Sequence, residues 1–289
     1  MDFLRPADWA EALAAKAARP RAMPIQGGTD VMVAVNFGAA RPDALLDLNG
    51  YRELRRIERS AGRVRIGAGV PYATIVREST RATPALAQAA RTVGSPQIRN
   101  RGTVGGNLGA ASPAGDCHPA LLAARATIEV ESAARGPRDI AVDDFYVGVK
   151  RNALEPDELI RAVRLDAAAG PQYFAKVGTR NAMVIAVCSF ALALYPETRT
   201  AGTGIGSAGP TPLRAHAAER YLAEALPWDA PAPLPDATLR EFGALVAAAA
   251  RPIDDVRGSA DYRTHALAVL ARRTLGWAWN DIVTARRAA

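Results

Sequence analysis

The chain has 289 residues, enough for one large domain or two ordinary ones with apolar cores that need no disulfides. Apolar residues make up 49% of the chain and charged residues 22%, which excludes an intrinsically disordered protein. The net charge of +7 comes almost wholly from arginines scattered among acidic residues, without the basic run typical of nucleic-acid binding, so nucleic acid is not an expected partner.

Alternating helical and strand-like segments make up the first part of the chain. Asp8 and Glu11 have the spacing of a capping box, which predicts a helix that begins there and ends at Pro20. A short strand leads into Gly27 and Gly28, and a turn or helix follows from Thr29 or Asp30. Further strands are predicted at 43–49, 63–69 and 157–165, helices at 71–79 and 84–93, and a short helix that runs into a strand at 119–132.

The pattern changes after residues 166–172, which resemble a linker. Three strands come in succession, and three helices follow them. Strands grouped before helices are typical of an α+β domain. The predicted strands are 173–180, 183–195 and 200–209, and the predicted helices are 215–226, 236–250 and 260–274.

Two glycine-rich loops could bind phosphate groups. The first contains Gly27, Gly28 and Thr29, although an ordinary tight turn has the same composition. The second is the stretch from Asn100 to Asp116, which offers Gly102, Thr103, Gly105, Gly106 and Asn107. Backbone amides free of side chains can converge on an anion, and two separate loops of this kind suit a diphosphate.

Asp116 ends the second glycine-rich stretch, just before a predicted helix. Its carboxylate could cap that helix, or it could accept hydrogen bonds from the hydroxyl groups of a ligand. Both interpretations stay open at this point.

Other chemistries find no support in the sequence. There is no Walker A motif, and Pro210 and Pro212 stand where a Rossmann helix would begin after the glycines of residues 204–209. Cys117 and Cys188 cannot hold an iron-sulfur cluster, the three histidines have no metal-ligand spacing, and no serine-hydrolase elbow is present. The chain has two loops suited to phosphate groups but no acid-base residues of its own. A bound organic redox cofactor explains this combination, because such a cofactor carries the chemistry itself.

The start of the chain has no leader pattern, and its longest apolar stretch, 182–195, is too short to span a bilayer. A cytoplasmic location is therefore expected.

Five motifs together resemble the FAD-binding medium subunit of the molybdenum hydroxylases, the family of xanthine dehydrogenase and carbon monoxide dehydrogenase. They are PIQGGTD, QIRNRGTVGGNLGAASPAGD, DELIRAV, YFAKVGTRNAMVIA and GIGSAGPTPLRA, and they cover nearly the whole chain. The resemblance implies an α+β fold with a two-part FAD-binding domain of the vanillyl-alcohol-oxidase (PCMH) type at 1–168, divided near residue 55 into 1–55 and 56–168. A smaller α+β domain of the CO dehydrogenase flavoprotein type, with a three-stranded antiparallel sheet plus helices, would occupy 172–289.

The resemblance also implies which residues bind FAD. They are Gln26, Gly27, Gly28, Thr29 and Asp30 in the first loop, Gly102, Thr103, Val104, Gly105, Gly106 and Asn107 in the second, and Val93, Asp116, Leu159 or Ile160, and Lys176 around the flavin. Lys176 could stabilise the electron-rich reduced flavin, or it could be an exposed strand lysine. Phe174 could cover a ring face or simply pack.

The family's division of labour implies the function. A large subunit oxidises the substrate at a molybdenum cofactor, a small subunit carries two [2Fe-2S] clusters, and the FAD subunit passes electrons to NAD, quinone or oxygen, in what we expect to be a dimer of heterotrimers. A purine or another N-heterocycle is the expected substrate, ahead of carbon monoxide. A self-contained flavin oxidoreductase of the same fold is the alternative.

Overall fold

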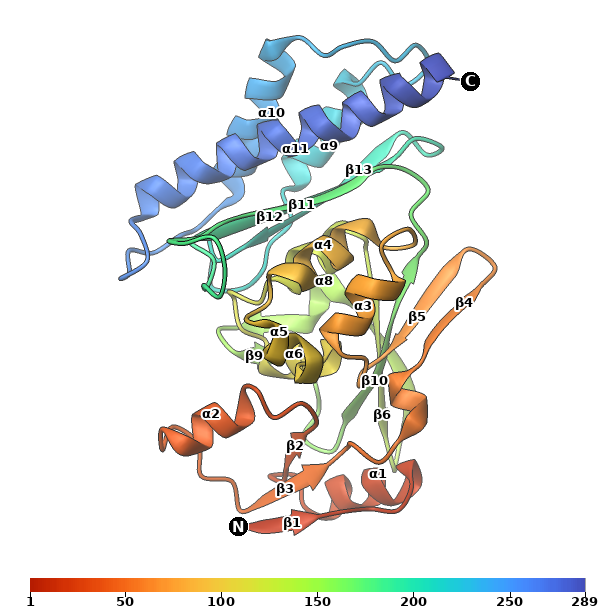
Figure 1. Ribbon diagram of the computed structural model, residues 1–289, viewed down its shortest axis with the longest axis vertical. Coiled ribbons are helices and arrows are strands. Elements are labelled where there is room, and N and C mark those ends of the chain that lie inside the picture. The colour runs from red at the N-terminus through yellow and green to blue at the C-terminus, as the bar shows by residue number, and fades with distance from the viewer. Residues whose placement is uncertain (289) are drawn as a thin grey trace.

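The computed structural model describes residues 1–288. The molecule is elongated, with a small sheet at the N-terminal end, a larger sheet with its helices in the middle, and a third sheet covered by helices at the C-terminal end (Figure 1). The two chain termini lie at opposite ends of this arrangement (Figure 1).

The N-terminal part is a three-stranded parallel sheet in the order β1-β3-β2. Its elements are β1 (Asp2–Leu4), α1 (Trp9–Ala18), β2 (Met23–Ile25), α2 (Val31–Asn36) and β3 (Ala44–Asp47). The predicted capping box is present in part: Asp8 Oδ1 accepts from the Glu11 amide at 2.8 Å, but Glu11 Oε2 accepts at 2.9 Å from the amide of Ala7, one residue before the cap. α1 buries Trp9, Ala12 and Leu13 in a core that also contains Leu46.

The central sheet is antiparallel, with five strands in the order β4-β5-β10-β6-β7. The strands are β4 (Ile57–Ser60), β5 (Arg63–Gly67), β6 (Thr127–Ser132), β7 (Gly136–Ala141) and β10 (Leu159–Asp166), preceded by a 3-10 helix (Arg52–Arg55). Burial alternates strictly along β6, so Ile128 and Val130 enter the core while Glu129 and Glu131 lie on the opposite face. One face of the sheet therefore packs under helices and the other carries charged side chains.

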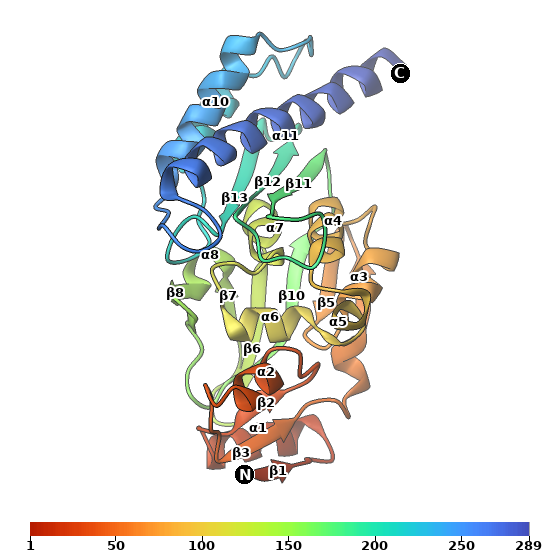
Figure 2. The same cartoon turned by 60° about the vertical axis from the view of Figure 1, so that its left-hand side comes forward.

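Helices between β5 and β6 cover the apolar face of the central sheet (Figure 2). They are α3 (Tyr72–Glu78), α4 (Pro84–Thr92), α5 (Pro96–Arg101), α6 (Val104–Ala110) and α7 (Cys117–Ala123). A short helix α8 (Val142–Phe145) and the two-stranded pair β8 (Tyr146–Gly148) and β9 (Arg151–Asn152) complete this part.

The C-terminal sheet is antiparallel in the order β11-β12-β13. It comprises β11 (Gln172–Val177), β12 (Cys188–Tyr195) and β13 (Thr200–Gly206), and the helices are α9 (His216–Ala225), α10 (Asp236–Ala249) and α11 (Ala260–Ala288). One face of the sheet packs on these helices through Phe190 and Leu192, and the other packs on α4 and α7 through Phe174 and Ala191.

The glycine-rich run 204–209 is not a Rossmann loop, as the prolines after it indicated. Its first residues lie in strand β13, which packs against α7. Gly202 and Gly204 lie in β13, where an added Cβ would overlap the carbonyl oxygens of Ala123 and Pro119, both in α7. Glycine in this strand thus lets a helix approach the sheet backbone directly.

The fold class is confirmed as mixed α+β, with a smaller C-terminal domain built on a three-stranded antiparallel sheet. Several details differ from the sequence predictions. Residues 183–187 precede β12 instead of belonging to it, the glycine-rich stretch contains the helix α6, and α11 continues past residue 274 to Ala288 because Leu275, Ala278 and Trp279 keep its apolar face buried. None of the helices in residues 1–288 combines the length and the apolar character needed to cross a membrane.

Candidate functional site

The two glycine-rich loops, some seventy-five positions apart in the chain, touch each other. An added Cβ on Gly27 would overlap the carbonyl oxygen of Arg101, and one on Gly102 would lie 3.3 Å from Thr29 Oγ1. The buried Gln26 side chain joins them further, because Thr103 Oγ1 donates to Gln26 Oε1 at 3.4 Å. Both loops therefore face one region between the N-terminal sheet and helices α5 and α6 (Figure 2).

The first loop keeps its backbone donors free. Within the described part of the chain, the amides of Gly27, Gly28, Thr29 and Asp30 donate to no other group. Gly28 has a φ of +75°, a conformation that favours glycine. Free amides in succession can bind an anion, as the sequence predicted for this loop.

The second loop differs from the expectation of free amides. The Gly105 amide donates to Ala68 O at 2.8 Å, the Gly106 amide to Thr103 Oγ1 at 3.0 Å, and the Asn107 amide to Thr103 O at 3.0 Å. These amides are used because Thr103 caps α6 and the helix begins inside the motif. The second loop thus offers space and the Asn107 side chain, and the first loop offers the free amides.

Gly105 allows α6 to pack closely on the end of β5. An added Cβ there would lie 2.6 Å from the Ala68 Cβ. Gly106 by contrast is exposed, and its added Cβ would meet only Thr103 Oγ1, at 3.2 Å. Of these two glycines, only Gly106 borders open space.

Asp116 does not cap α7, since its side chain makes no capping hydrogen bond. Its Oδ2 lies 2.6 Å from Lys176 Nζ and accepts from Thr92 Oγ1 at 2.8 Å. The Lys176 side chain is only 9% exposed, so it is not a surface lysine on a strand. Burial raises the pKa of Asp116, and the nearby Lys176 ammonium opposes that shift. A buried ion pair therefore joins β11 to the residue that ends the glycine-rich stretch.

Four buried polar atoms near this ion pair have no hydrogen-bond partner within residues 1–288. They are Tyr72 Oη, Asn107 Oδ1, Asp116 Oδ1 and His118 Nε2. A buried polar atom left unbonded costs about 1–3 kcal/mol, so such groups call for a ligand or a rearrangement. Hydroxyl and amide groups of a ligand would satisfy them.

The apolar candidates lie around this region in different surroundings. Leu159 is buried in the N-terminal core beside Trp9 and Leu54, whereas Ile160 joins the central core with Val104. Neighbouring residues on a strand face opposite ways, so only Ile160 lies on the side of α6. Val93 packs partly buried at the end of α4, and Phe174 is buried in the central core.

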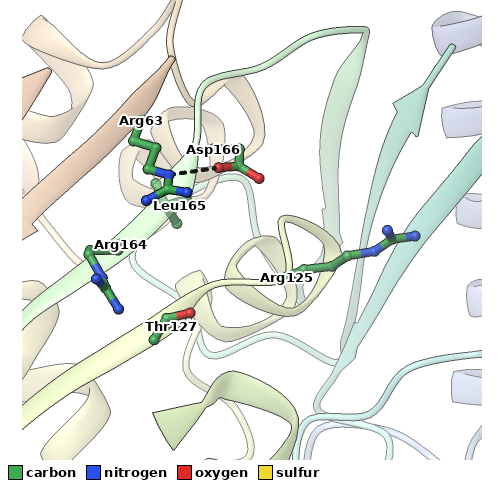
Figure 3. A pocket seen from close by; sticks show the side chains of 6 residues that line it. All are labelled: Arg63, Arg125, Thr127, Arg164, Leu165 and Asp166. Atoms are coloured by element: carbon green, nitrogen blue, oxygen red, sulfur yellow. Dashed lines mark ion pairs between the residues drawn. The ribbon is translucent and has the colours of Figure 1, made fainter. Parts of the chain in front are cut away.

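An arginine-lined pocket lies away from the glycine loops. Figure 3 shows it between Arg63, Arg125 and Arg164, where Asp166 pairs with Arg63. The β5–β10 register places Arg63 opposite Asp166 and Gly67 opposite Ala162, so this pocket and Ala68 mark opposite ends of the strand pair. The pocket is therefore separate from the candidate site.

Two family models match the chain in sequence. Residues 1–166 match the FAD binding domain in molybdopterin dehydrogenase, and residues 173–278 match the CO dehydrogenase flavoprotein C-terminal domain. The chain belongs to the FAD-binding subunits of the molybdenum hydroxylase family. It is an oxidoreductase subunit, as the sequence predicted.

Similar proteins share most of this subunit's length. The nicotinate dehydrogenase FAD-subunit of Eubacterium barkeri is 35% identical over 212 residues, which are 68% of this chain and 70% of that protein. The nicotine 6-hydroxylase medium subunit of Paenarthrobacter nicotinovorans is 34% identical over 260 residues, 87% of each chain. A structure of carbon monoxide dehydrogenase from Hydrogenophaga pseudoflava matches with a TM-score of 0.88 at 27% identity, over 97% of both chains.

The residues of this FAD-binding subunit fit the cofactor of its family. The first loop has free amides for a diphosphate, and the unpaired Asp116 and Asn107 oxygens suit a polyhydroxyl chain or a ligand amide. When bound, FAD supplies the electron transfer that no side chain here can perform. Among residues 1–288, no three potential metal ligands come together.

Four residues around the site were missed by the sequence analysis. Thr92, Gly115, His118 and Tyr146 surround Asp116 and Asn107 in space. The sequence showed only that His118 has no metal-ligand spacing, and the structure places it fully buried. Its position in an apolar run, with Leu121 and Leu122 on the same short helix, was the available signal for burial.

Proposed function

We propose that this subunit holds FAD against its two glycine loops and passes electrons from [2Fe-2S] clusters of a small partner subunit to an external acceptor. The observation that carries the proposal is the contact between the loops, in which Gly27 lies directly on the carbonyl of Arg101. Loops so far apart in the chain, meeting at free amides, are suited to one diphosphate.

The side chains have distinct roles in this proposal. The amides of Gly27 to Asp30 bind the diphosphate, while Gln26 and Thr103 hold the two loops together. Gly106 leaves room for the ligand beside Asn107, while Gly102 and Gly105 let neighbouring segments pack closely and Val104 anchors the loop in the central core. Asp116 accepts from the ribityl hydroxyls, and Val93, Lys176 and Ile160, rather than Leu159, lie beside the flavin ring.

We also propose that the domain division falls at 1–168 and 172–289, with subdomains near 1–55 and 56–168. The three separate apolar cores support this division, although the central core includes residues of the C-terminal sheet.

The complex is proposed to hydroxylate a purine or another N-heterocycle on a large molybdenum subunit. The names of the nicotinate and nicotine relatives support this class, and both exceed 30% identity to this chain. The match to carbon monoxide dehydrogenase keeps that reaction as the alternative. NAD, quinone and oxygen are the proposed acceptors, in a dimer of heterotrimers.

Purification of the native assembly tests the proposal. We expect a flavin spectrum, copurifying small and large subunits identified by mass, and flavin bleaching by an N-heterocycle under anaerobic conditions only when all subunits are present. Bleaching of the isolated chain by an organic substrate would indicate a self-contained flavin enzyme instead. Bleaching of the complex by carbon monoxide alone would favour the carbon monoxide dehydrogenase type.

A further inference from the structure

The α4–α5 turn, from Thr92 to Gly94, carries Val93, which the proposed function places beside the flavin ring. The turn borders the buried ion pair, because Thr92 Oγ1 lies 2.8 Å from Asp116 Oδ2 and the Thr92 carbonyl oxygen lies 3.4 Å from Lys176 Nζ. Gly94 has a φ of +45°, a conformation that favours glycine. One side of the turn thus belongs to the candidate site.

Arg99 of α5 holds the turn from another side. Its Nη1 donates to the carbonyl oxygen of Val93 at 3.0 Å and to that of Gly94 at 2.9 Å. These two carbonyl groups are the hydrogen-bond partners that the Arg99 side chain has within residues 1–288. Carbonyl oxygens at the end of a helix carry a partial negative charge, which favours a cation there. The guanidinium therefore stabilises the turn that follows α4.

The peptide groups on both sides of Val93 are each held by a cation. Lys176 lies at the Thr92 carbonyl of the first group, and Arg99 binds the Val93 carbonyl of the second. Because a residue has only two soft backbone dihedral angles, fixing both peptide planes fixes the direction of the Cα–Cβ bond between them. Valine is also stiff at χ1. The Val93 side chain, which is only partly buried, is therefore held in one direction.

We propose that Arg99 is a positioning residue for the flavin ring, because it holds the α4–α5 turn so that Val93 packs against the isoalloxazine of FAD. Both hydrogen bonds of its side chain go to the turn, and neither goes to a glycine loop. Loss of Arg99 should therefore weaken binding at the flavin end of the ligand and leave the diphosphate end unchanged. The inference rests on the proposed function, since it requires FAD at the two loops.

Two probes separate the two ends of the ligand. The full-length chain is freed of FAD, and rebinding is measured with FAD by flavin fluorescence and with ADP by calorimetry, for wild type and Arg99→Met. ADP has the diphosphate but no flavin ring. We expect Arg99→Met to weaken FAD binding about tenfold and ADP binding by no more than about twofold. Equal losses for FAD and ADP, or an unchanged affinity for FAD, would overturn the inference.

A double-mutant cycle tests whether Arg99 acts through Val93. FAD affinity is compared among wild type, Arg99→Met, Val93→Ala and the double variant. We expect Arg99→Met to cost about tenfold in the wild-type background and less than about twofold in the Val93→Ala background, where the positioned side chain is missing. Equal effects in both backgrounds would mean that Arg99 has only a structural role.

Arg91→Met is the matched control. Arg91 lies in the last turn of α4, is exposed, and makes no side-chain hydrogen bond within residues 1–288. The substitution removes the same charge close to the same turn, so FAD affinity should stay unchanged. An equal loss of affinity in Arg91→Met and Arg99→Met would show that net charge matters and that the hydrogen bonds to the turn do not.

A second pair of variants keeps the test valid if Arg99→Met fails to fold. A single nitrogen of Arg99 makes both hydrogen bonds, so a lysine ammonium can replace it, whereas a glutamine side chain is shorter and uncharged. We expect Arg99→Lys to keep FAD affinity within about threefold and Arg99→Gln to lose about tenfold. Equal affinities of these two variants would contradict the inference. Wild-type chain that binds neither FAD nor ADP would instead overturn the proposed function itself.

Discussion

Single residues in the two loops are glycine for two different reasons. Gly28 has a positive φ, so its conformation favours glycine. Gly27 and Gly105 have ordinary backbone angles, but each lies against another backbone segment, at Arg101 and Ala68. Space, more than conformation, therefore determines the contact between the loops.

Gly27→Ala is expected to abolish FAD retention, because the new methyl group would push Arg101 and the second loop away. The flavin content of the purified full-length chain measures this. Gly50→Ala is the control, since no heavy atom lies within 4 Å of its added Cβ. Wild-type flavin content in a folded Gly27→Ala protein would contradict the placement of FAD at the loop contact.

Lys176→Met is expected to destabilise the FAD-free chain by about 3–5 kcal/mol at pH 7, because it leaves the Asp116 carboxylate buried without its cation. Urea unfolding measures the change. Arg19→Met removes the cation of the exposed Arg19–Asp2 pair, which solvent screens, so it should lower the free energy of unfolding far less. A similar loss of unfolding free energy in the two variants would argue that the Asp116–Lys176 pair is not buried.

The effect of Lys176→Met is also expected to depend on pH. Burial already raises the folded-state pKa of Asp116 above its ordinary 3.8. A carboxyl with a raised folded pKa stabilises the fold fully below its unfolded pKa and loses that contribution as pH rises through the folded pKa. Loss of the lysine raises the folded-state pKa of Asp116 further. The difference in unfolding free energy between Lys176→Met and wild type should therefore become smaller as the pH is lowered from 7 to 5. A gap that is independent of pH would mean that Asp116 is not the group affected.

Among the secondary-structure elements, β13 and α7 show how close backbone packing joins the two halves of the molecule. Gly202 and Gly204 of β13 face the carbonyl groups of Ala123 and Pro119 directly. The same helix begins directly after Asp116 and carries His118. The position of β13 therefore affects the position of the candidate site.

Gly204→Ala is expected to destabilise the chain by more than about 2 kcal/mol, because its Cβ would overlap the Pro119 carbonyl and separate α7 from the sheet. Gly276→Ala in α11 is the opposite case. No heavy atom lies within 4 Å of that added Cβ, so the helix should gain about 0.5–1 kcal/mol. Denaturant unfolding of both variants measures the contrast, and a neutral Gly204→Ala would contradict the packing argument.

Over the whole molecule, the central core extends across the linker. Phe174, Ala191 and Ala193 belong to the C-terminal sheet, yet they pack in the same cluster as the helices over the central sheet. β11 also brings Lys176 to Asp116. Folding of the C-terminal sheet and completion of the candidate site are therefore linked.

Phe174→Ala is expected to destabilise the full chain by about 3–5 kcal/mol and to weaken FAD retention, because the cavity loosens β11 and with it Lys176. Phe37→Ala serves as control, since Phe37 is 85% exposed and its loss should change stability by no more than about 0.5 kcal/mol. Thermal unfolding and flavin content measure both effects. Unchanged flavin content in a destabilised Phe174→Ala protein would mean that FAD binding does not depend on the packing of β11.

The sequence alone determined the fold class, the family and the strands-before-helices order of the C-terminal part. Caps, prolines, alternation and glycine motifs act over a few residues, so Asp8, Pro84 and the motif at 103–107 could be interpreted locally. The FAD contacts, the domain boundaries and the cytoplasmic location are still predictions.

Only the tertiary structure decided which groups are free and which are paired. Folding used the amides of Gly105 and Gly106, paired Asp116 with Lys176, separated Leu159 from Ile160, and buried His118 against Tyr146. Ala68, Lys176 and Tyr146 lie 28 to 60 residues from their partners in the chain, and the facing sides of Leu159 and Ile160 depend on packing. Local sequence patterns carry no information about such partners, because hydrogen bonding and burial are settled only when distant segments meet.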